Sequence, residues 1–456
     1  MLIKKSMILG EEQLEALSLI KQFISSSDLF FSLSGYAGTG KSTIIKNLVE
    51  YLGNSKIDFV LCAPTHKAKG VLKYFTEKEA ITIHQLLSLS PNLEIFDLDY
   101  KDLLFYSNNL AKSLFPYQGV VICDESSMIN DNIFKLLCER AEVYSCKIIF
   151  IGDVAQLRPV KSNYNSKVFD VESNFTLKKI YRQSEGVGYG DVLEELRKNV
   201  ITKFDNKIGE NGSLYCYTNM IDLFKQAIPI FQKAIKEQNI FEAKILAYTN
   251  NRVSALNTKM REILFPGNEQ YYKNEIITCY ENISYGIGEF WNSMDYIITK
   301  DPIKYDINIP YFSKLPAFKL SLYDYSNNEE STICILDKTI PKNFWDSLAN
   351  QIEEIRLEAV DAKLRKNRKS SYLWKQYFEM VNSFASPINL YYDNRVIKKK
   401  SFDYGYGITI HRSQGSSINN IFIDMKDVNK CWNEEELRQL QYVALSRSRQ
   451  NIYIYQ

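Results

Sequence analysis

The sequence predicts an α/β fold in which helices cover parallel sheets, and it predicts this arrangement twice along the chain. Between residues 11 and 160, helical hydrophobic spacing alternates with short apolar runs of strand length. A second alternating pattern begins near Phe175 and includes the apolar runs 243–248 and 420–425. The chain has 456 residues, of which 45% are apolar. At roughly 150 residues per domain, this length allows about three domains with cores of their own.

The elements of the first pattern follow one another in a regular order. We expect helices at 11–24 and 42–51, and strands at 29–33, 59–62, 120–123 and 147–151. Residues 88–116 interrupt the pattern with a polar and aromatic stretch that is longer than a usual connection. We therefore expect an inserted hairpin or subdomain there.

The second pattern contains a larger insertion. Prolines and short runs rich in Tyr, Ile and Thr predict a small β module over about 268–340. Trp345, Leu348, Ile352 and Ile355 then recur at helical spacing, which predicts a helical arm over about 342–384. Two basic clusters, 363–369 and 398–400, are expected to be solvated faces rather than tracks for DNA.

Composition excludes several classes of protein. The 56 Lys and Arg against 54 Asp and Glu leave a formal charge of +2, so a polyanion would be bound by local patches. The apolar runs are too short to span a membrane, and the N-terminal one is too short for a secretory signal. Eight scattered cysteines without a C-x-x-C pair predict free thiols and no structural zinc. A cytoplasmic location is expected.

A phosphate-binding loop stands at residues 35–42. The segment reads G-x-x-x-x-G-K-S and lies after a predicted strand and before a predicted helix. Its glycines let backbone N–H groups surround phosphates, Lys41 can reach the β and γ oxygens, and the Ser42 hydroxyl can ligate Mg²⁺. The residues expected to contact the nucleotide here are Gly35, Gly38, Thr39, Gly40, Lys41, Ser42 and Thr43.

Two carboxylates follow the predicted strand at 120–123. Asp124 and Glu125 would lie at the carboxyl edge of the sheet, where α/β folds bind ligands. There Asp124 can hold Mg²⁺ while Glu125 polarises the attacking water, a division that hydrolysis requires. Gln156 follows the next strand and could sense the γ-phosphate, although spacing alone does not settle the role of its amide.

Eight short segments follow the phosphate-binding loop in a fixed order. They lie at 63–69, 82–87, 124–128, 152–160, 177–183, 248–253, 407–415 and 442–449. Together they resemble the motifs of superfamily 1 helicases of the RecD/Dda type, and the match covers nearly the whole chain. Arg158 stands where this family commonly has proline, and Ser417 where an acidic residue is frequent. The second departure puts a carboxylate contact to the nucleotide sugar in doubt.

The resemblance implies two RecA-like P-loop domains that hold ATP and Mg²⁺ between them. It places the first RecA-like ATPase domain at 1–87 and 117–170, with a pin or wedge insertion at 88–116. It places the second RecA-like domain at 171–267 and 401–456, with an SH3-like β module and helical arm at 268–400.

The resemblance also implies roles at the nucleotide. Arg182 and Arg447 would be arginine fingers that spread positive charge onto the transition state. Gln13 would read adenine, unless it is a solvated helix residue. Tyr181 would stack on the base, with core packing as an equal alternative. Gln414 and Gly415 complete the expected nucleotide contacts.

Contacts to single-stranded DNA are implied at positions with hydroxyl, imidazole or amide groups, which bond phosphate oxygens without reading sequence. A capping or core role is the alternative for each of them. These residues are Thr65, His66, Thr82, His84, Thr249, Asn250, Thr409 and His411. Phe96 is the expected tip of the pin, with Tyr100 as second choice; alternatively Phe96 packs inward against Leu93 and Leu98.

The resemblance therefore implies an ATP-dependent DNA helicase, competent as a monomer, that translocates 5′ to 3′ on single strands. Expected partners are single-stranded DNA, junctions of single and double strands, and single-strand-binding or replication proteins. The expected location is the cytoplasm, or the host cytoplasm for a phage protein. Two alternatives remain: a nucleic-acid-stimulated ATPase that remodels complexes without unwinding, and a small-molecule kinase.

Overall fold

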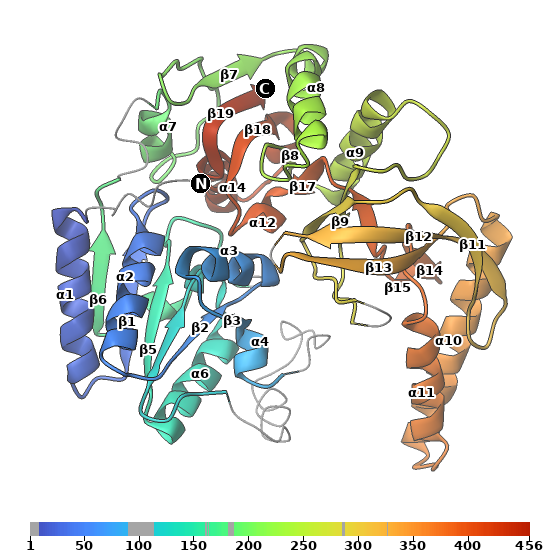
Figure 1. Cartoon of the computed structure of the whole chain (residues 1–456), viewed down its shortest axis with the longest axis horizontal. Helices are drawn as coiled ribbons and strands as arrows, with labels where there is room; N and C mark the ends of the chain where they lie inside the picture. The colour runs from blue at the N-terminus through green and yellow to red at the C-terminus, as the bar shows by residue number, and fades with distance from the viewer. Residues whose placement is uncertain are drawn as a thin grey trace. The chain divides into compact units, whose positions relative to one another are not determined.

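The computed structural model describes residues 9–89, 114–159, 162, 164–180, 187–284, 288–325 and 327–456 (Figure 1). The chain divides into two compact units. Unit 1 comprises Met1–Leu223, Leu246–Thr249 and Thr409–Gln456, and unit 2 comprises Phe224–Ile245 and Asn250–Ile408. The eight cysteines are free thiols. Within the described part of the chain, no helix combines the length and apolar character needed to cross a membrane.

Unit 1 contains a parallel sheet of six strands in the order β3-β2-β4-β5-β1-β6. The strands are β1 (Phe30–Gly35), β2 (Phe59–Ala63), β3 (Ala80–Thr82), β4 (Val120–Cys123), β5 (Lys147–Gly152) and β6 (Ser173–Leu177). The helices of this part are α1 (Glu11–Ser25), α2 (Lys41–Asn54), α3 (His66–Thr76), α4 (Ile83–Leu86) and α6 (Asp131–Tyr144), with 3₁₀ turns η2 (Ser126–Met128) and η3 (Lys167–Phe169).

The alternation of side chains along β4 explains why this sheet is covered on both faces. Val120 and Ile122 belong to one buried cluster, which includes residues of α1 and α2. Val121 and Cys123 belong to a second cluster, which includes residues of α6. Successive residues of a strand point to opposite faces, so a strand that is apolar throughout requires helices on both sides.

β6 lies at one edge of this first sheet. It pairs in parallel with β1, and the hydroxyls of Ser34 and Thr176 lie 2.6 Å apart. The sheet therefore extends beyond residue 170, where the sequence places the boundary between two domains, and the pattern expected from Phe175 onward begins inside it. An apolar run does not by itself indicate which sheet a strand joins.

A second sheet of five strands has the order β17-β8-β18-β19-β7. Its strands are β7 (Leu214–Tyr217), β8 (Ala243–Ala247), β17 (Gly407–Thr409), β18 (Ile418–Asp424) and β19 (Ser448–Tyr455). β19 pairs in parallel with both β18 and β7. The associated helices are α7 (Gly190–Glu195), α8 (Met220–Lys236), α9 (Asn250–Leu264), α12 (Ile410–Ser413), α13 (Met425–Val428) and α14 (Glu434–Ser446).

Unit 2 contains an antiparallel sheet in the order β11-β12-β10-β9-β16, with β13 paired to β12. Its strands are β9 (Ile276–Cys279), β10 (Asp295–Ile298), β11 (Ile303–Asn308), β12 (Lys314–Asp324), β13 (Glu329–Leu336) and β16 (Phe402–Tyr404). A hairpin of β14 (Leu390–Tyr392) and β15 (Arg395–Lys398) lies between the arm helices and β16 in the sequence.

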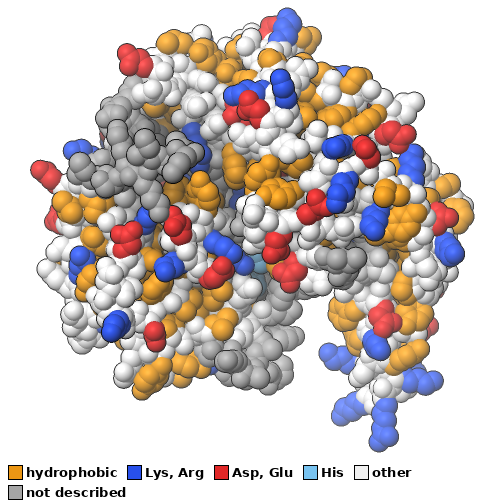
Figure 2. All heavy atoms as spheres, in the orientation of Figure 1, with side chains coloured by type: hydrophobic (Ala, Val, Ile, Leu, Met, Phe, Trp, Pro, Cys, Tyr) orange, Lys and Arg blue, Asp and Glu red, His pale blue; other side chains and the backbone are white. Residues whose placement is uncertain are grey.

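Two long helices, α10 (Lys342–Leu364) and α11 (Ser370–Val381), pack against each other as an arm. Trp345, Leu348 and Ile352 of α10 are buried in one cluster with Met380 of α11. The basic residues of 363–369 lie at the turn between the two helices and are exposed, as expected for a solvated face. Figure 2 shows these blue side chains gathered at the end of the arm.

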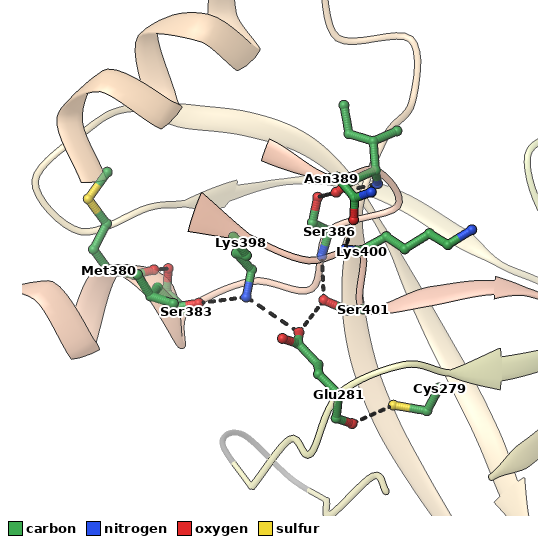
Figure 3. Close-up of polar contacts among 11 residues, drawn as sticks. Cys279, Glu281, Met380, Ser383, Ser386, Asn389, Lys398, Lys400 and Ser401 are labelled. Carbon is green, nitrogen blue, oxygen red and sulfur yellow. Dashed lines mark hydrogen bonds and ion pairs between the residues drawn. The ribbon is translucent and has the colours of Figure 1, made fainter. Parts of the chain in front are cut away.

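The second basic cluster does not form a solvated face throughout, so that expectation is wrong for Lys398. This side chain is 3% exposed and forms an ion pair with Glu281 at 3.4 Å (Figure 3). Its ammonium group also donates to the carbonyl of Val381 at 3.1 Å, and Glu281 accepts from the Ser401 hydroxyl. Burial lowers the pKa of Lys398, while the Glu281 carboxylate opposes this shift. Lys398 thus connects strand β15 to the end of the arm.

Candidate active site

The phosphate-binding loop connects β1 to α2 in unit 1. Gly38 and Gly40 have φ values of 86° and 85°, which glycine adopts without strain. Gly40 is the N-cap of α2, so backbone N–H groups at the start of this helix remain available to an anion. The Lys41 ammonium group donates to the carbonyls of Gly35 at 2.6 Å and Tyr36 at 3.2 Å. The Lys41 ammonium group is therefore held beside the loop that is expected to surround the phosphates of the nucleotide.

Gln13 is tied to this loop. Its Nε2 donates to the carbonyl of Thr39 at 3.0 Å, and its Oε1 accepts from the N–H of Gly10 at 3.0 Å. The side chain is 4% exposed, so the alternative of a solvated helix residue does not hold. A Cβ atom at Gly40 would lie 2.0 Å from Gln13 Nε2. A side chain at position 40 would therefore require the end of the Gln13 side chain to shift, and its backbone would have to adopt a φ of 85°, which favours glycine.

Asp124 and Glu125 follow β4, at the carboxyl edge of the sheet. Asp124 Oδ1 accepts from the N–H of Glu125 at 2.9 Å. Burial and the adjacent Glu125 carboxylate raise the pKa of Asp124 to about 7, and Lys41 opposes the shift. Glu125 has φ 51°, a left-handed conformation that costs a non-glycine residue about 1–2 kcal/mol. Such local strain is typical of functional positions.

The segment that follows β5 is connected to α14 through the hydroxyl group of Tyr442. Tyr442 of α14 donates to Asp153 Oδ2 at 2.9 Å and accepts from the N–H of Ala37, in the phosphate-binding loop, at 3.0 Å. Gln156 Nε2 lies 3.5 Å from the same Asp153 oxygen. Tyr442 and Asp153 are both buried. Three separate segments are thus held together at one point of unit 1.

Arg447 immediately follows α14 and is 5% exposed. Its guanidinium group donates to the carbonyl of Val443 at 3.2 Å, to the Ser446 hydroxyl at 3.0 Å and to the carbonyl of Ser416 at 3.5 Å. These bonds orient the group against the end of α14 and against the segment that contains Ser416. Gly415, beside Ser416, has φ 71° and approaches α3, where an added Cβ would lie 3.3 Å from that of Ala68.

A cavity of about 450 Å³ in unit 1 brings these residues together. Most of its lining residues are those that the sequence assigns to the nucleotide; it is lined by Gln13, Ala37, Gly38, Gly40, Lys41, Ser42, Thr43, Val71, Phe75, Asp124, Glu125, Gln156, Gly415, Ser416, Ser417, Ser446 and Arg447. A volume of this size accommodates a small cofactor.

Unpartnered polar atoms indicate that this cavity suits a charged ligand. Glu125 Oε2 and Gln156 Oε1, from two residues that line the cavity, are buried without a hydrogen-bond partner among the described residues. Gln414 Nε2 is also unpartnered, but this residue precedes the lining residue Gly415 and does not itself line the cavity. Buried polar atoms of this kind are costly unless a ligand or water completes them. Asp124, whose burial disfavours its charged form, would gain from a neighbouring cation. The residues present therefore fit ATP with Mg²⁺.

Three expected site residues fall outside the described residues. They are Tyr181, Arg182 and Phe96, and most of the insertion at 88–116 lies outside as well. The second arginine finger and the pin tip stay predictions.

The expected DNA contacts of the first sheet follow β2 and β3. Thr65 and Thr82 cap α3 and α4 by accepting from the N–H groups of Ala68 at 3.1 Å and Gln85 at 3.2 Å. Burial, helped by nearby cationic groups, lowers the pKa of His66 to about 3, and burial lowers that of His84 to about 4. Both imidazoles are therefore neutral near pH 7, so they can act on a strand as hydrogen-bonding groups but not as cations.

The remaining expected DNA contacts follow β8 and β17. The N–H and the hydroxyl of Thr249 bond the Asp427 carboxylate, the N–H at 2.8 Å. The His411 ring lies 6.1 Å from that of Tyr248, with a side chain that is 43% exposed. Thr409 is buried, and Asn250 is the exposed first residue of α9 in unit 2. Among these positions, His411 and Asn250 are the more accessible.

Sequence reasoning missed several groups around the cavity. Tyr442 lies in a recognised motif, but no pattern shows that its hydroxyl bonds two other segments. Arg158, noted as a departure from the family, forms an ion pair with Glu435 of α14. The Arg197 guanidinium lies over the Tyr36 ring, 3.9 Å from its centroid. The only signal available for these contacts was the unusual arginine at position 158.

Comparisons with known proteins are consistent with this site. Residues 9–219 match the AAA domain, and residues 404–455 match the UvrD-like helicase C-terminal domain. The ATP-dependent DNA helicase dda of Enterobacteria phage T4 is 25% identical, over 98% of this chain and 98% of its own. The RecBCD enzyme subunit RecD of Buchnera aphidicola is 26% identical, over 93% of this chain and 69% of its own.

Solved structures show the same fold. The Pif1 helicase from Candida albicans aligns with a TM-score of 0.52 at 17% identity, covering 98% of this chain and 94% of that chain. The Pif1 helicase from Bacteroides, in complex with ADP-AlF3 and ssDNA, aligns with a TM-score of 0.50 at 18% identity, covering 98% and 92%. This likeness confirms the predicted α/β class with two RecA-like domains. These relatives confirm the resemblance to superfamily 1 helicases that the ordered motifs predict, and the relatives are ATP-dependent enzymes that act on DNA.

Proposed function

We propose that this chain uses Mg-ATP hydrolysis to translocate 5′ to 3′ on single-stranded DNA and to unwind duplex. One observation carries the proposal: Lys41, Asp124, Glu125, Gln156 and Arg447, from four separate segments, line one cavity. A site that only binds a nucleotide does not need a base for water or an arginine at the γ-phosphate. The relatives support the same activity, because one is an ATP-dependent DNA helicase and a structural neighbour holds ADP-AlF3 with ssDNA.

Each residue has a distinct part in the proposed reaction. The loop N–H groups and Lys41 would bind the phosphates, while Ser42 and Asp124 would hold Mg²⁺, which supplies positive charge that neutralises the phosphates. Glu125 orients and deprotonates the attacking water, and Gln156 bonds the terminal phosphate. Arg447 moves from its contacts with Val443 and Ser446 toward the γ-phosphate, where it stabilises negative charge.

The proposed organisation and partners follow the family. The division into two RecA-like domains, with a pin at 88–116 and a β module with its arm at 268–400, belongs to this proposal. So do single-stranded DNA and its junctions with duplex as substrates, with Thr65, His66, Thr82, His84, Thr249, Asn250, Thr409 and His411 along the strand. We expect the chain to act in the cytoplasm, where its free thiols stay reduced.

The deciding experiment compares duplexes of equal length that carry either a 5′ or a 3′ single-stranded tail. With Mg-ATP, we expect displacement of the strand only from the 5′-tailed duplex, and none with the Lys41→Ala variant. Displacement only from the 3′-tailed duplex would reverse the assigned direction. ATP hydrolysis that single strands stimulate without any displacement would favour the alternative of a remodelling translocase.

A further inference from the structure

The turn between α10 and α11 carries the densest group of positive charge in the described part of unit 2. Within seven residues it has five cations, Lys363, Arg365, Lys366, Arg368 and Lys369. All five side chains are exposed, and Figure 2 shows them together at the end of the arm. We call these residues the arm tip.

The arm tip lies at the end of two helices that pack against each other. α10 has 23 residues, which at a rise of 1.5 Å each make a helix about 34 Å long. Its buried face packs against α11 through a cluster that includes Trp345, Ile352, Ile355 and Met380. Lys398 and Glu281 anchor the far end of α11 in the β module, because the Lys398 ammonium group bonds the carbonyl of Val381. The charges therefore lie at the end of a packed pair of helices that is joined to the β module.

Helix stability does not explain this charge. Lys363 and Arg365 lie at the carboxyl end of α10, where the helix dipole favours cations. Arg368 and Lys369, however, precede the amino end of α11, where the dipole disfavours them. Among the described residues, Asp361 is the carboxylate that neutralises a tip cation, through an ion pair with Arg365 at 3.0 Å. The remaining like charges repel one another, and a polyanionic ligand would offset that repulsion.

The chemistry of the arm tip favours a duplex over a single strand. Proteins that hold single strands combine cations with aromatic side chains on which bases stack. Residues 363–369 contain no aromatic side chain, and the nearest one in the sequence, the exposed Tyr372, lies outside the cluster in the first turn of α11. Long, flexible cations without aromatic groups suit the regularly spaced phosphates of a duplex, which they contact without reading sequence.

We propose that the arm tip binds the phosphate backbone of duplex DNA. The inference rests on the proposed function, since it adds a duplex contact to a motor that grips the single strand. The contact holds the duplex at the β module and arm, and it is independent of base sequence.

The test measures DNA binding in the absence of ATP as a function of salt. The tip variant changes all five cations to Gln in the full chain. The matched control changes five exposed lysines elsewhere in unit 2 to Gln, namely Lys300, Lys304, Lys314, Lys319 and Lys342. Probes are a blunt duplex of about 20 base pairs, the same duplex with a 5′ tail, and a short oligo-dT strand.

We expect the tip variant to lose affinity for both duplexes by about tenfold or more near 0.1 M salt. The slope of log affinity against log salt should fall by about 3–4, because each phosphate contact contributes about 0.9 and five cations set a ceiling of about 4.5. Affinity for oligo-dT, and the binding of the control variant, should stay within about twofold of the wild type.

Three results would overturn the inference. They are an unchanged duplex affinity and slope, an equal loss for oligo-dT, and an equal loss in the control variant. Since all five side chains are exposed, the tip variant should melt like the wild type. A smaller variant, Lys366→Glu with Arg368→Glu, repeats the comparison if it does not. If the wild-type chain showed no ATPase activity stimulated by DNA, the proposed function would be refuted. The binding experiment uses no ATP, so it tests the duplex contact of the arm tip separately.

Discussion

The Tyr442 hydroxyl makes the two hydrogen bonds that hold three segments of the active site together. Replacing Tyr442 with Phe removes one oxygen atom and leaves the ring in place. The lost bond to the Asp153 carboxylate, 2.9 Å long, is worth about 1.5–3 kcal/mol, and the bond from the Ala37 N–H, 3.0 Å long, about 0.5–1.5 kcal/mol. Both partners would stay buried, so we expect the variant to lose about 2–4 kcal/mol of stability.

Thermal melting, followed by near-ultraviolet circular dichroism, measures this loss. At about 2–4 °C per kcal/mol for a domain of this size class, the melting temperature should fall by about 4–16 °C. The matched control is Tyr215→Phe, whose ring stacks on Tyr453 at 5.3 Å and whose hydroxyl has no hydrogen bond among the described residues. A shift for Tyr442→Phe no larger than that of Tyr215→Phe would refute the assigned role of the hydroxyl.

Four further outcomes are expected. Lys41→Ala should abolish ATP hydrolysis but keep single-strand binding; loss of both would indicate misfolding or a wrong site. Glu125→Gln should still bind ATP while turnover falls by about 10² or more, and near-normal turnover would remove this residue from the mechanism. Arg447→Ala should lower kcat far more than ATP affinity, and a pure affinity defect would assign it to ground-state binding. His66 and His84 have lowered pKa values in the folded chain, so as the pH drops they bind protons in the unfolded chain first. The free energy of unfolding should therefore fall below a pH of about 6.5. At a pH of about 5.5 the loss should be about 1–1.5 kcal/mol for each histidine. A His84→Asn variant should show a shallower fall in melting temperature over this range, and an identical fall would contradict the shift.

Residues that follow strands could be assigned to the site from the sequence. Asp124 and Glu125 come directly after β4 and Gln156 follows β5, and parallel strands bring their carboxyl ends to one edge. The fixed spacing of the phosphate-binding loop likewise placed Lys41 at the start of α2. Arg447 could be placed only through the family resemblance, because no local pattern relates it to a loop four hundred residues earlier.

Contacts that depend on packing could not be predicted. Lys398 belongs to a run of three lysines, which predicts a solvent-exposed side chain. It is buried against Glu281 instead, because strand β15 turns it inward. β6 joined the first sheet although its sequence resembles the start of a second pattern. In both cases the deciding partner lies far away in the sequence, and neither residue type nor spacing identifies it.

The contact between Gln13 and Gly40 has a consequence for redesign of the nucleotide specificity. The amide of Gln13 occupies the space into which a side chain at position 40 would extend, with 2.0 Å separating Nε2 from an added Cβ. The residue expected to read the base and the loop that surrounds the phosphates are thus neighbours within one crowded volume. A larger side chain at position 13 would therefore compete for the space beside Gly40, whereas a shorter one would leave that space free. Selection for altered base preference should consequently recover smaller side chains at position 13.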